Sequence, residues 1–259
     1  MNASPSVLVH RDSAVLTEAV CARLITTLID IHAAGRVPSW VLTGGTIADR
    51  VHRSLAESAG RRAVDWSRVE LWWGDERFVE RTSDERNELQ ARRALLDVLA
   101  LDPERVHPMP AANDPTDDPD VAARLYAERL AAAASPQDHG ASPVFDVLML
   151  GVGPDGHVAS LFPERPALHD DATVVAVRGA PKPPPTRISL TLPALRRARE
   201  VWFVVSGADK AQAVRMALSG AGEMQIPAAG VHGRARTLWL LDRDAAAEVP
   251  AGLSRPASP

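Results

Sequence analysis

Residues 145–157 read FDVLMLGVGPDGH, an apolar run that ends in glycines. The apolar residues predict a buried strand, and the glycines predict a turn at its end. We expect the chain to continue as a helix after the turn, where free N–H groups at the helix N-terminus would bind an anion. His157 closes the turn, and its imidazole is a candidate acid or base because histidine titrates near neutrality. The segment predicts an enzyme that acts on an anionic small molecule.

Strands and helices alternate on both sides of this segment. We expect further strands at residues 7–9, 40–42, 69–73, 173–177, 188–192, 201–205 and 237–241. Helices are expected at 13–34 (with Asp12 as its cap), 46–58, 84–100, from the end of the 111–119 loop to 134, and at 209–218. This alternation predicts a Rossmann-like α/β fold, with a doubly wound, mostly parallel sheet and helices on both faces. We expect a single domain over residues 1–249 and a disordered tail over 250–259.

Composition narrows the class of protein. The chain has 259 residues and a net charge of −4, which argues against nucleic acid as the partner. Cys21 is the only cysteine, so neither an intramolecular disulfide nor a cysteine-based zinc site is expected. Residues 1–5 lack the pattern of a signal peptide, and no apolar run approaches the ~20 residues that span a bilayer. We therefore expect a soluble cytoplasmic protein.

Two other strand ends carry polar residues suited to an anionic ligand. Residues 43–46 read TGGT, and Gly44, Gly45 and Thr46 offer close backbone approach, N–H groups and a hydroxyl to a phosphate. Residues 74–77 read GDER, where Asp75 is polar and Arg77 can grip a phosphate or carboxylate with its planar fork. Each motif alone also fits an ordinary turn. Because the carboxyl ends of parallel strands form the ligand side of such a sheet, we expect the motifs to meet at one edge.

Two cations lie near later strand ends and complete the candidate set. Arg187 opens one expected strand, and Lys210 opens the helix that follows Ser206. Lys210 and Lys182 are the chain's only lysines, which makes each a stronger candidate for a functional role than an average surface lysine. Surface charge remains the alternative explanation for each cation taken alone.

Other chemistries are less well supported. The glycine run matches Gly-x-Gly-x-x-Gly, but it lies far from the first strand and lacks the acidic residue that would bind an NAD ribose. Arg178 leaves NADP open as an alternative, and a purely structural His157 is another. No Gly-x-Ser-x-Gly or His-Glu-x-x-His motif occurs, so neither a covalent serine nor a metal is indicated.

Taken together, these segments resemble the lactonases of the glucosamine-6-phosphate isomerase/6-phosphogluconolactonase family. The resemblance rests on LTGGT (42–46), WGDER (73–77), SDERN (83–87), GVGPDGHVASLFP (151–163), PKPPPTRISLTL (181–192), GADKA (207–211) and IPA (226–228). Deaminases of this fold share the Asp-Gly-His turn but typically continue with Ile-Ala-Phe-Asn-Glu, where this chain has residues 158–163, VASLFP. A sugar-phosphate-sensing regulator would need a DNA-binding segment ahead of the first expected strand, where there is little room. Both remain alternatives.

The resemblance implies a sugar-phosphate isomerase type of fold and hydrolysis of 6-phospho-D-glucono-1,5-lactone without metal or cofactor. It implies His157 as general base, Asp155 as the residue that orients it, and backbone N–H groups of the glycine turn or a nearby cation as the oxyanion stabiliser. Arg77 is a candidate for catalysis, and Asn87 for a sugar hydroxyl. The remaining candidates for the substrate are Gly44, Gly45, Thr46, Asp75, Gly153, Gly156, Arg187 and Lys210. Which cation meets the phosphate stays open, and a monomer is favoured.

Overall fold

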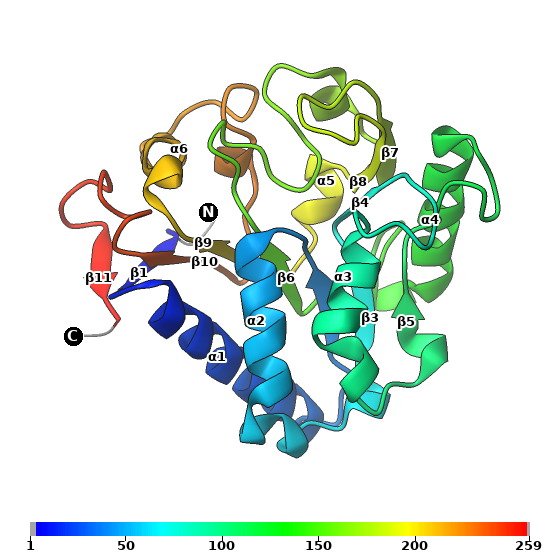
Figure 1. Ribbon diagram of the computed structural model, residues 1–259, viewed down its shortest axis with the longest axis horizontal. Coiled ribbons are helices and arrows are strands. Elements are labelled where there is room, and N and C mark those ends of the chain that lie inside the picture. Colours follow the sequence, from blue (N-terminus) through cyan, green and yellow to red (C-terminus); the bar gives the residue numbers. More distant parts are fainter. Residues whose placement is uncertain (1–3, 258–259) are drawn as a thin grey trace.

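The computed structural model describes residues 4–257, and its main feature is an eight-stranded parallel sheet (Figure 1). The strand order is β11-β1-β10-β9-β6-β2-β3-β5. The strands are β1 (Ser6–His10), β2 (Ser39–Leu42), β3 (Glu70–Trp73), β5 (Val106–His107), β6 (Val147–Leu150), β9 (Glu200–Val205), β10 (Arg236–Asp242) and β11 (Ser254–Pro256). Residues 1–3 of the segment 1–5, which lacks the pattern of a signal peptide, and residues 258–259 of the tail expected at 250–259 lie outside the described residues.

Helices cover both faces of this sheet, as the sequence predicted. They are α1 (Ser13–Ala33), α2 (Thr46–Glu57), α3 (Asn87–Ala94), α4 (Pro119–Ala133), α5 (Leu192–Leu195) and α6 (Ala211–Leu218). Trp40 of β2 meets His52 of α2 edge-on, whereas Trp72 of β3 meets Tyr126 of α4. Trp40 pairs in register with Leu71, the neighbour of Trp72, so the two tryptophans point to opposite faces. α2 and α4 therefore pack on opposite sides.

The strand order reverses between β2 and β6, which places the glycine-rich segments side by side. From β2 the chain proceeds outward to β3 and β5, and from β6 it proceeds the other way to β9 and β10. β2 and β6 are parallel neighbours, so the turns that begin at Thr43 and Gly151 leave adjacent strand ends. Such a reversal is where open α/β sheets bind ligands.

A second sheet, which the sequence analysis did not predict, lies beside α4 (Figure 1). Its three antiparallel strands are β4 (Asp75–Arg77), β8 (Arg187–Leu190) and β7 (Val174–Val177), in that order. Residues 74–77 were expected to form a turn after the third strand, but residues 75–77 continue as β4. The strand at Arg187 was expected in the main sheet, and it is instead completely buried in the small one.

Three other expectations about elements are wrong. No α-helix follows the glycine run, and the chain makes turns there before a short 3₁₀ helix at Pro166–His169. The helix expected at 84–100 is α3 alone, because Leu95 leaves helical geometry (φ −148°) and only a 3₁₀ turn follows at Leu96–Val98. Ser254–Pro256, expected to be disordered, pairs with β1 as a parallel edge strand.

None of the helices in the described part of the chain has the length and apolar character needed to cross a membrane.

Candidate active site

A cavity of about 540 Å³ opens at the carboxyl ends of β2, β6 and β9. Residues of the small sheet form another part of its lining. The cavity brings together ten of the twelve residues proposed from the sequence: Gly44, Gly45, Thr46, Asp75, Arg77, Asn87, Gly153, His157, Arg187 and Lys210. Asp155 and Gly156 do not line it. Five cations (Arg50, Arg77, Lys182, Arg187, Lys210) face two carboxylates (Asp75, Asp209), so the cavity favours an anionic ligand.

His157 lines the cavity, and its imidazole is hydrogen-bonded to Asp155. The distance from His157 Nδ1 to Asp155 Oδ1 is 2.5 Å. Burial raises the pKa of Asp155, but its hydrogen bond to His157 and the charge of the imidazole together lower it to about 2. An ionised Asp155 favours the tautomer whose proton is on Nδ1, and Nε2 then has a free lone pair. The pair has the arrangement of a general base and its orienting carboxylate.

The glycines of this turn fix where the imidazole lies. A Cβ on Gly153 would come within 2.0 Å of His157 Nδ1, so only glycine lets the ring pack against the backbone here. Gly156 has φ +82°, a backbone conformation that favours glycine, and it packs against Ile226. Gly156 therefore shapes the turn and does not line the cavity. The Gly153 N–H donates to His157 O and the Gly156 N–H donates to Gly153 O, each at 2.9 Å. Two N–H groups considered for the oxyanion are therefore already bonded within the turn.

The anion-binding helix end is provided by α2 rather than by a helix after His157. Gly45 is the N-cap of α2 and offers no side chain to cap it. Residues 44–47, at this end of the helix, line the cavity. The first N–H groups of a helix lack intrahelical partners and carry a partial positive charge, which suits a phosphate oxygen.

Hydrogen bonds join Asp75 of β4 to the chain after His157. The Ser160 hydroxyl donates to Asp75 Oδ2 at 2.6 Å, and the Ser160 N–H donates to Ser189 Oγ of β8 at 3.2 Å. Asp75 and Ser189 are themselves cross-strand partners. Both serines are fully buried. These contacts fix the His157 segment against the small sheet.

Arg187 is the first residue of β8 and holds the loop that carries Lys182. Its Nε donates to Pro184 O at 3.2 Å and its Nη2 donates to Lys182 O at 3.0 Å. Burial lowers the pKa of Arg187, an effect that the nearby Asp75 opposes. Its guanidinium lies 5.7 Å from the ring centre of Phe162, whose other neighbour is His157 at 4.6 Å. Phe162 thus lies close to both the cation and the imidazole.

The two lysines meet at Asp209. Lys210 Nζ lies 2.7 Å from Asp209 Oδ2, and this hydrogen bond lowers the pKa of Asp209. The charge of Lys182 acts on that pKa in the same direction, which places the second lysine nearby. Both lysines of the chain therefore converge on one part of the cavity.

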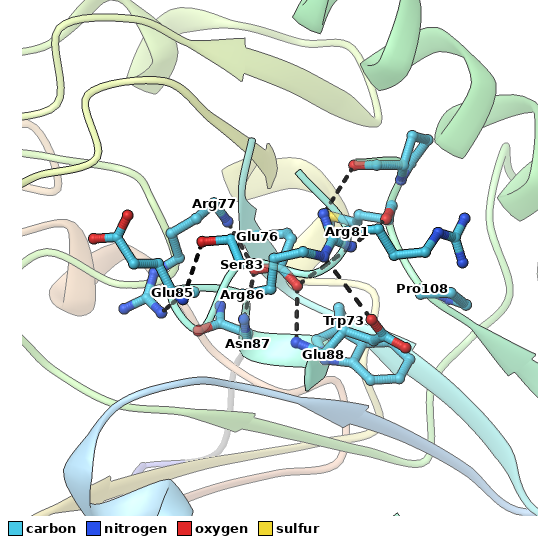
Figure 2. A network of polar contacts seen from close by, with 12 residues as sticks. Trp73, Glu76, Arg77, Arg81, Ser83, Glu85, Arg86, Asn87, Glu88 and Pro108 are labelled. Atoms are coloured by element: carbon cyan, nitrogen blue, oxygen red, sulfur yellow. Dashed lines mark hydrogen bonds and ion pairs between the residues drawn. The ribbon is translucent and has the colours of Figure 1, made fainter. Parts of the chain in front are cut away.

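Glu76 lies beneath the site and organises Arg77 and Asn87 (Figure 2). Glu76 Oε1 accepts the N–H groups of Arg77 at 2.8 Å and of Asn87 at 2.7 Å, and Oε2 accepts that of Glu88 at 2.9 Å. Burial raises the pKa of Glu76 to about 7, although Arg86 and these three N–H groups act in the opposite direction. Glu76, a residue of β4, thereby caps the N-terminus of α3.

A sequence model of the family described as glucosamine-6-phosphate isomerases/6-phosphogluconolactonase matches residues 11–239. The chain belongs to this family.

Relatives in the family match all or nearly all of the chain. The 6-phosphogluconolactonase of Streptomyces coelicolor is 56% identical over 260 residues, covering 100% of both chains. That of Mycobacterium tuberculosis is 49% identical and covers 95% of this chain and 99% of its own. The structure of 6-phosphogluconolactonase from Trypanosoma brucei superposes with a TM-score of 0.80 at 25% identity, covering 95% of this chain and 99% of that one. A monomeric glucosamine-6-phosphate deaminase shares the fold at 17% identity, with a TM-score of 0.76 and coverage of 93% and 99%.

Several cavity residues were absent from the sequence-based candidate set for this family member. The sequence singles out Lys182 only as one of two lysines, and Phe162 only as part of the family motif. Arg50 had not been considered, although it lies four residues after Thr46 and hence one helical turn into α2. That spacing from TGGT is the signal that could have identified Arg50.

Proposed function

We propose that this chain hydrolyses 6-phospho-D-glucono-1,5-lactone to 6-phospho-D-gluconate, the sugar-phosphate chemistry named for its relatives. The observation that carries the proposal is the His157–Asp155 pair on the wall of a cationic cavity. A δ-lactone is an activated ester, so a positioned base and a stabilised carbonyl oxygen suffice to open it. No covalent intermediate is required.

In the proposed reaction His157 first accepts a proton as a general base and then donates it as a general acid. Its Nε2 removes a proton from a water molecule, whose oxygen bonds to C1 of the lactone. The resulting tetrahedral intermediate collapses by breaking the bond from C1 to the ring oxygen, and the imidazolium returns the proton to that oxygen. Asp155 keeps Nδ1 protonated and stabilises the imidazolium while it exists. General-base assistance of this kind is worth ~10²–10⁴-fold in rate.

A cationic side chain, and not the glycine turn, is assigned to stabilise the oxyanion. The N–H groups of Gly153 and Gly156 already donate within the turn, so they are poorly placed to bind a new acceptor. Arg77 and Arg187 project from adjacent strands at paired positions and both line the cavity. Arg187 spends Nε and Nη2 on the 182–184 loop, which leaves Arg77 as the better candidate for the developing charge.

The phosphate is assigned to the N-terminus of α2 and to the two lysines. Helix N–H groups at residues 45–47 and the lysine ammonium groups all favour a dianion. In this proposal the active unit is a single domain of residues 1–249 that works in the cytoplasm as a monomer, with no cofactor or metal.

An assay with two substrates tests the function. The purified protein should open 6-phosphogluconolactone faster than the spontaneous rate and should release no ammonia from glucosamine 6-phosphate. Ammonia release without lactone opening would instead assign the chain to the deaminase activity of its fold relatives.

A further inference from the structure

Arg50 of α2 lines the cavity and brings it a positive charge that no neighbouring carboxylate neutralises. Within the described part of the chain, its one hydrogen bond runs from Nη1 to the neutral hydroxyl of Ser13 at 2.9 Å. The adjacent carboxylate, Asp49, is taken by Arg53, whose Nε and Nη2 lie 2.8 and 3.2 Å from its two oxygens. Arg50 therefore keeps its full charge and two donor nitrogens, Nε and Nη2, for a ligand.

The helix geometry places the guanidinium of Arg50 near the start of α2. Residue 50 follows Thr46, the first residue of α2, by four positions, so the two side chains lie on one face of the helix, one turn apart. Side chains of an α-helix lean toward its N-terminus, and a long one covers the turn before its own Cα. Residues 44–47, around the start of α2, line the same cavity as Arg50.

The contact with Ser13 leads independently to the same placement. Ser13 is the first residue of α1, which follows β1 just as α2 follows β2. β1 and β2 run parallel within the main sheet, so both helices begin at its carboxyl edge, and they pack against each other (Figure 1). A side chain from the second turn of α2 that reaches Ser13 extends toward this edge, where the cavity opens.

A phosphate monoester fits this end of the cavity better than a neutral group does. At neutral pH it is close to a dianion and offers only acceptor oxygens. The first N–H groups of α2 supply donors with a partial positive charge, and the planar fork of Arg50 supplies a full charge beside them. Lys210 differs from Arg50 because its ammonium group already shares its charge with Asp209, at 2.7 Å.

This inference rests on the proposed function: we propose that Arg50 is a specificity-determining residue for the phosphate of the lactone, and that Ser13 is its positioning residue. Ser13 accepts from Nη1 and thereby orients the fork, with Nε and Nη2 left for phosphate oxygens. Arg50 acts with the lysines, and its charge helps the protein to distinguish a phosphorylated lactone from an unphosphorylated one.

A comparison of two lactones tests Arg50. Arg50→Gln should lower the ratio of kcat/KM for 6-phosphogluconolactone to that for glucono-1,5-lactone by about tenfold, mainly through KM. This is the low end of the range for a charge-assisted contact, because Arg50 is exposed to water. Calorimetry should show a similar loss of affinity for 6-phosphogluconate. Arg53→Gln is the matched control and should keep the wild-type ratio, since Arg53 lies on the same helix, is paired with Asp49 and does not line the cavity.

A double-mutant cycle tests Ser13. Ser13→Ala should lower the same ratio by about two- to fivefold, the effect of one neutral hydrogen bond. In the Arg50→Gln background it should cause no further loss, because the side chain that it orients is gone. Fully additive losses would remove Ser13 as the positioning residue. Arg50→Lys should keep part of the ratio, since it retains the charge but loses the planar fork.

One result would overturn the role of Arg50. An Arg50→Gln protein with a normal thermal melt, the wild-type ratio and the wild-type affinity for 6-phosphogluconate would show that Arg50 does not contact the phosphate. The calorimetric measurement separates this outcome from a failure of the proposed function. Wild-type protein that binds 6-phosphogluconate through Arg50 but does not open the lactone would refute the proposed function and support the phosphate contact.

Discussion

At the scale of single residues, the proposed chemistry depends on which nitrogen of His157 is free. Asp155 Oδ1 is bonded to Nδ1, so Nε2 is the only ring nitrogen left for the water. Asp155 does not line the cavity, and its influence on the reaction therefore passes through the imidazole. The two residues should consequently respond differently to substitution.

His157→Gln is expected to lower kcat by ~10²–10⁴-fold with a small change in KM, because a general base acts in the transition state. Asp155→Asn should also lower kcat, since the amide can stabilise the unproductive tautomer. Stopped-flow measurement of lactone opening checks both, beside thermal melts that separate lost chemistry from lost folding. Near-normal kcat in folded His157→Gln would move the search for the base to Asp75.

Lys210→Ala is expected to raise KM for the phosphorylated lactone by roughly 10- to 150-fold, the ~1.5–3 kcal/mol of one charge-assisted contact. Lys182→Ala should act in the same direction but less strongly, because Lys182 is exposed to water. Both should leave the rate with unphosphorylated glucono-1,5-lactone unchanged. Arg53→Ala is the control, since Arg53 is paired with Asp49 on α2 and lies outside the cavity lining. Equal losses on both lactones would argue against a phosphate role for the lysines.

Most of the residues proposed from the sequence line the cavity, because strand-end motifs converge in a parallel sheet. The sequence could not predict that Glu76 holds the backbones of Arg77 and Asn87, because this contact forms only when β4 and the start of α3 meet in space. It also left the glycine-turn N–H groups and a nearby cation both open as oxyanion donors, since nothing in the sequence shows that Gly153 and Gly156 bond within the turn.

At the scale of elements, the start of helix α3 is set by a residue of strand β4. Arg86, the residue at its N-cap, makes no capping hydrogen bond with its side chain, and Glu76 supplies the cap instead. This explains why the predicted helix at 84–100 began too early, because local sequence signals do not reveal a cap that comes from β4. The small sheet escaped prediction for a similar reason, since β4 has only three residues and its partner strand begins at Arg187.

The cap predicts how stability depends on pH. Burial raises the pKa of Glu76 in the folded protein to about 7 from 4.5, so the group stabilises the fold fully below about pH 4.5 and this contribution is lost as the pH rises through 7. The melting temperature of wild type should therefore fall between pH 5 and pH 8 relative to Glu76→Gln, by the equivalent of roughly 3 kcal/mol at most. Calorimetry at several pH values checks this, with Glu88→Gln as control. Parallel pH profiles for wild type and Glu76→Gln would contradict it.

At the scale of the whole molecule, the cavity is assembled from two sheets. The main sheet supplies the turns after β2 and β6, and the small sheet supplies Asp75, Arg77 and Arg187. The alternation of strands and helices was sufficient to predict the parallel sheet with helices on both faces. It did not predict the edge strand at Ser254–Pro256, because three residues that pair with β1 have no distinctive pattern.

A metal-independent reaction is expected for the intact protein. The described residues contain no cluster of three or more histidine, cysteine or carboxylate side chains that could hold a metal ion. Exhaustive chelation should leave the rate of lactone opening within about twofold of the untreated protein. Activity that disappears on chelation and returns with one particular divalent ion would refute the proposed mechanism.

The position of β1 has a consequence for protein synthesis. β1 leaves the ribosome before the other described strands, and its strand neighbours β10 and β11 begin only at Arg236 and Ser254. Until residue 236 and those after it have been translated, β1 has unpaired backbone groups on both sides. The sheet can therefore be completed only after residue 256 has been translated, and β1 on the nascent chain is until then a natural target for chaperones.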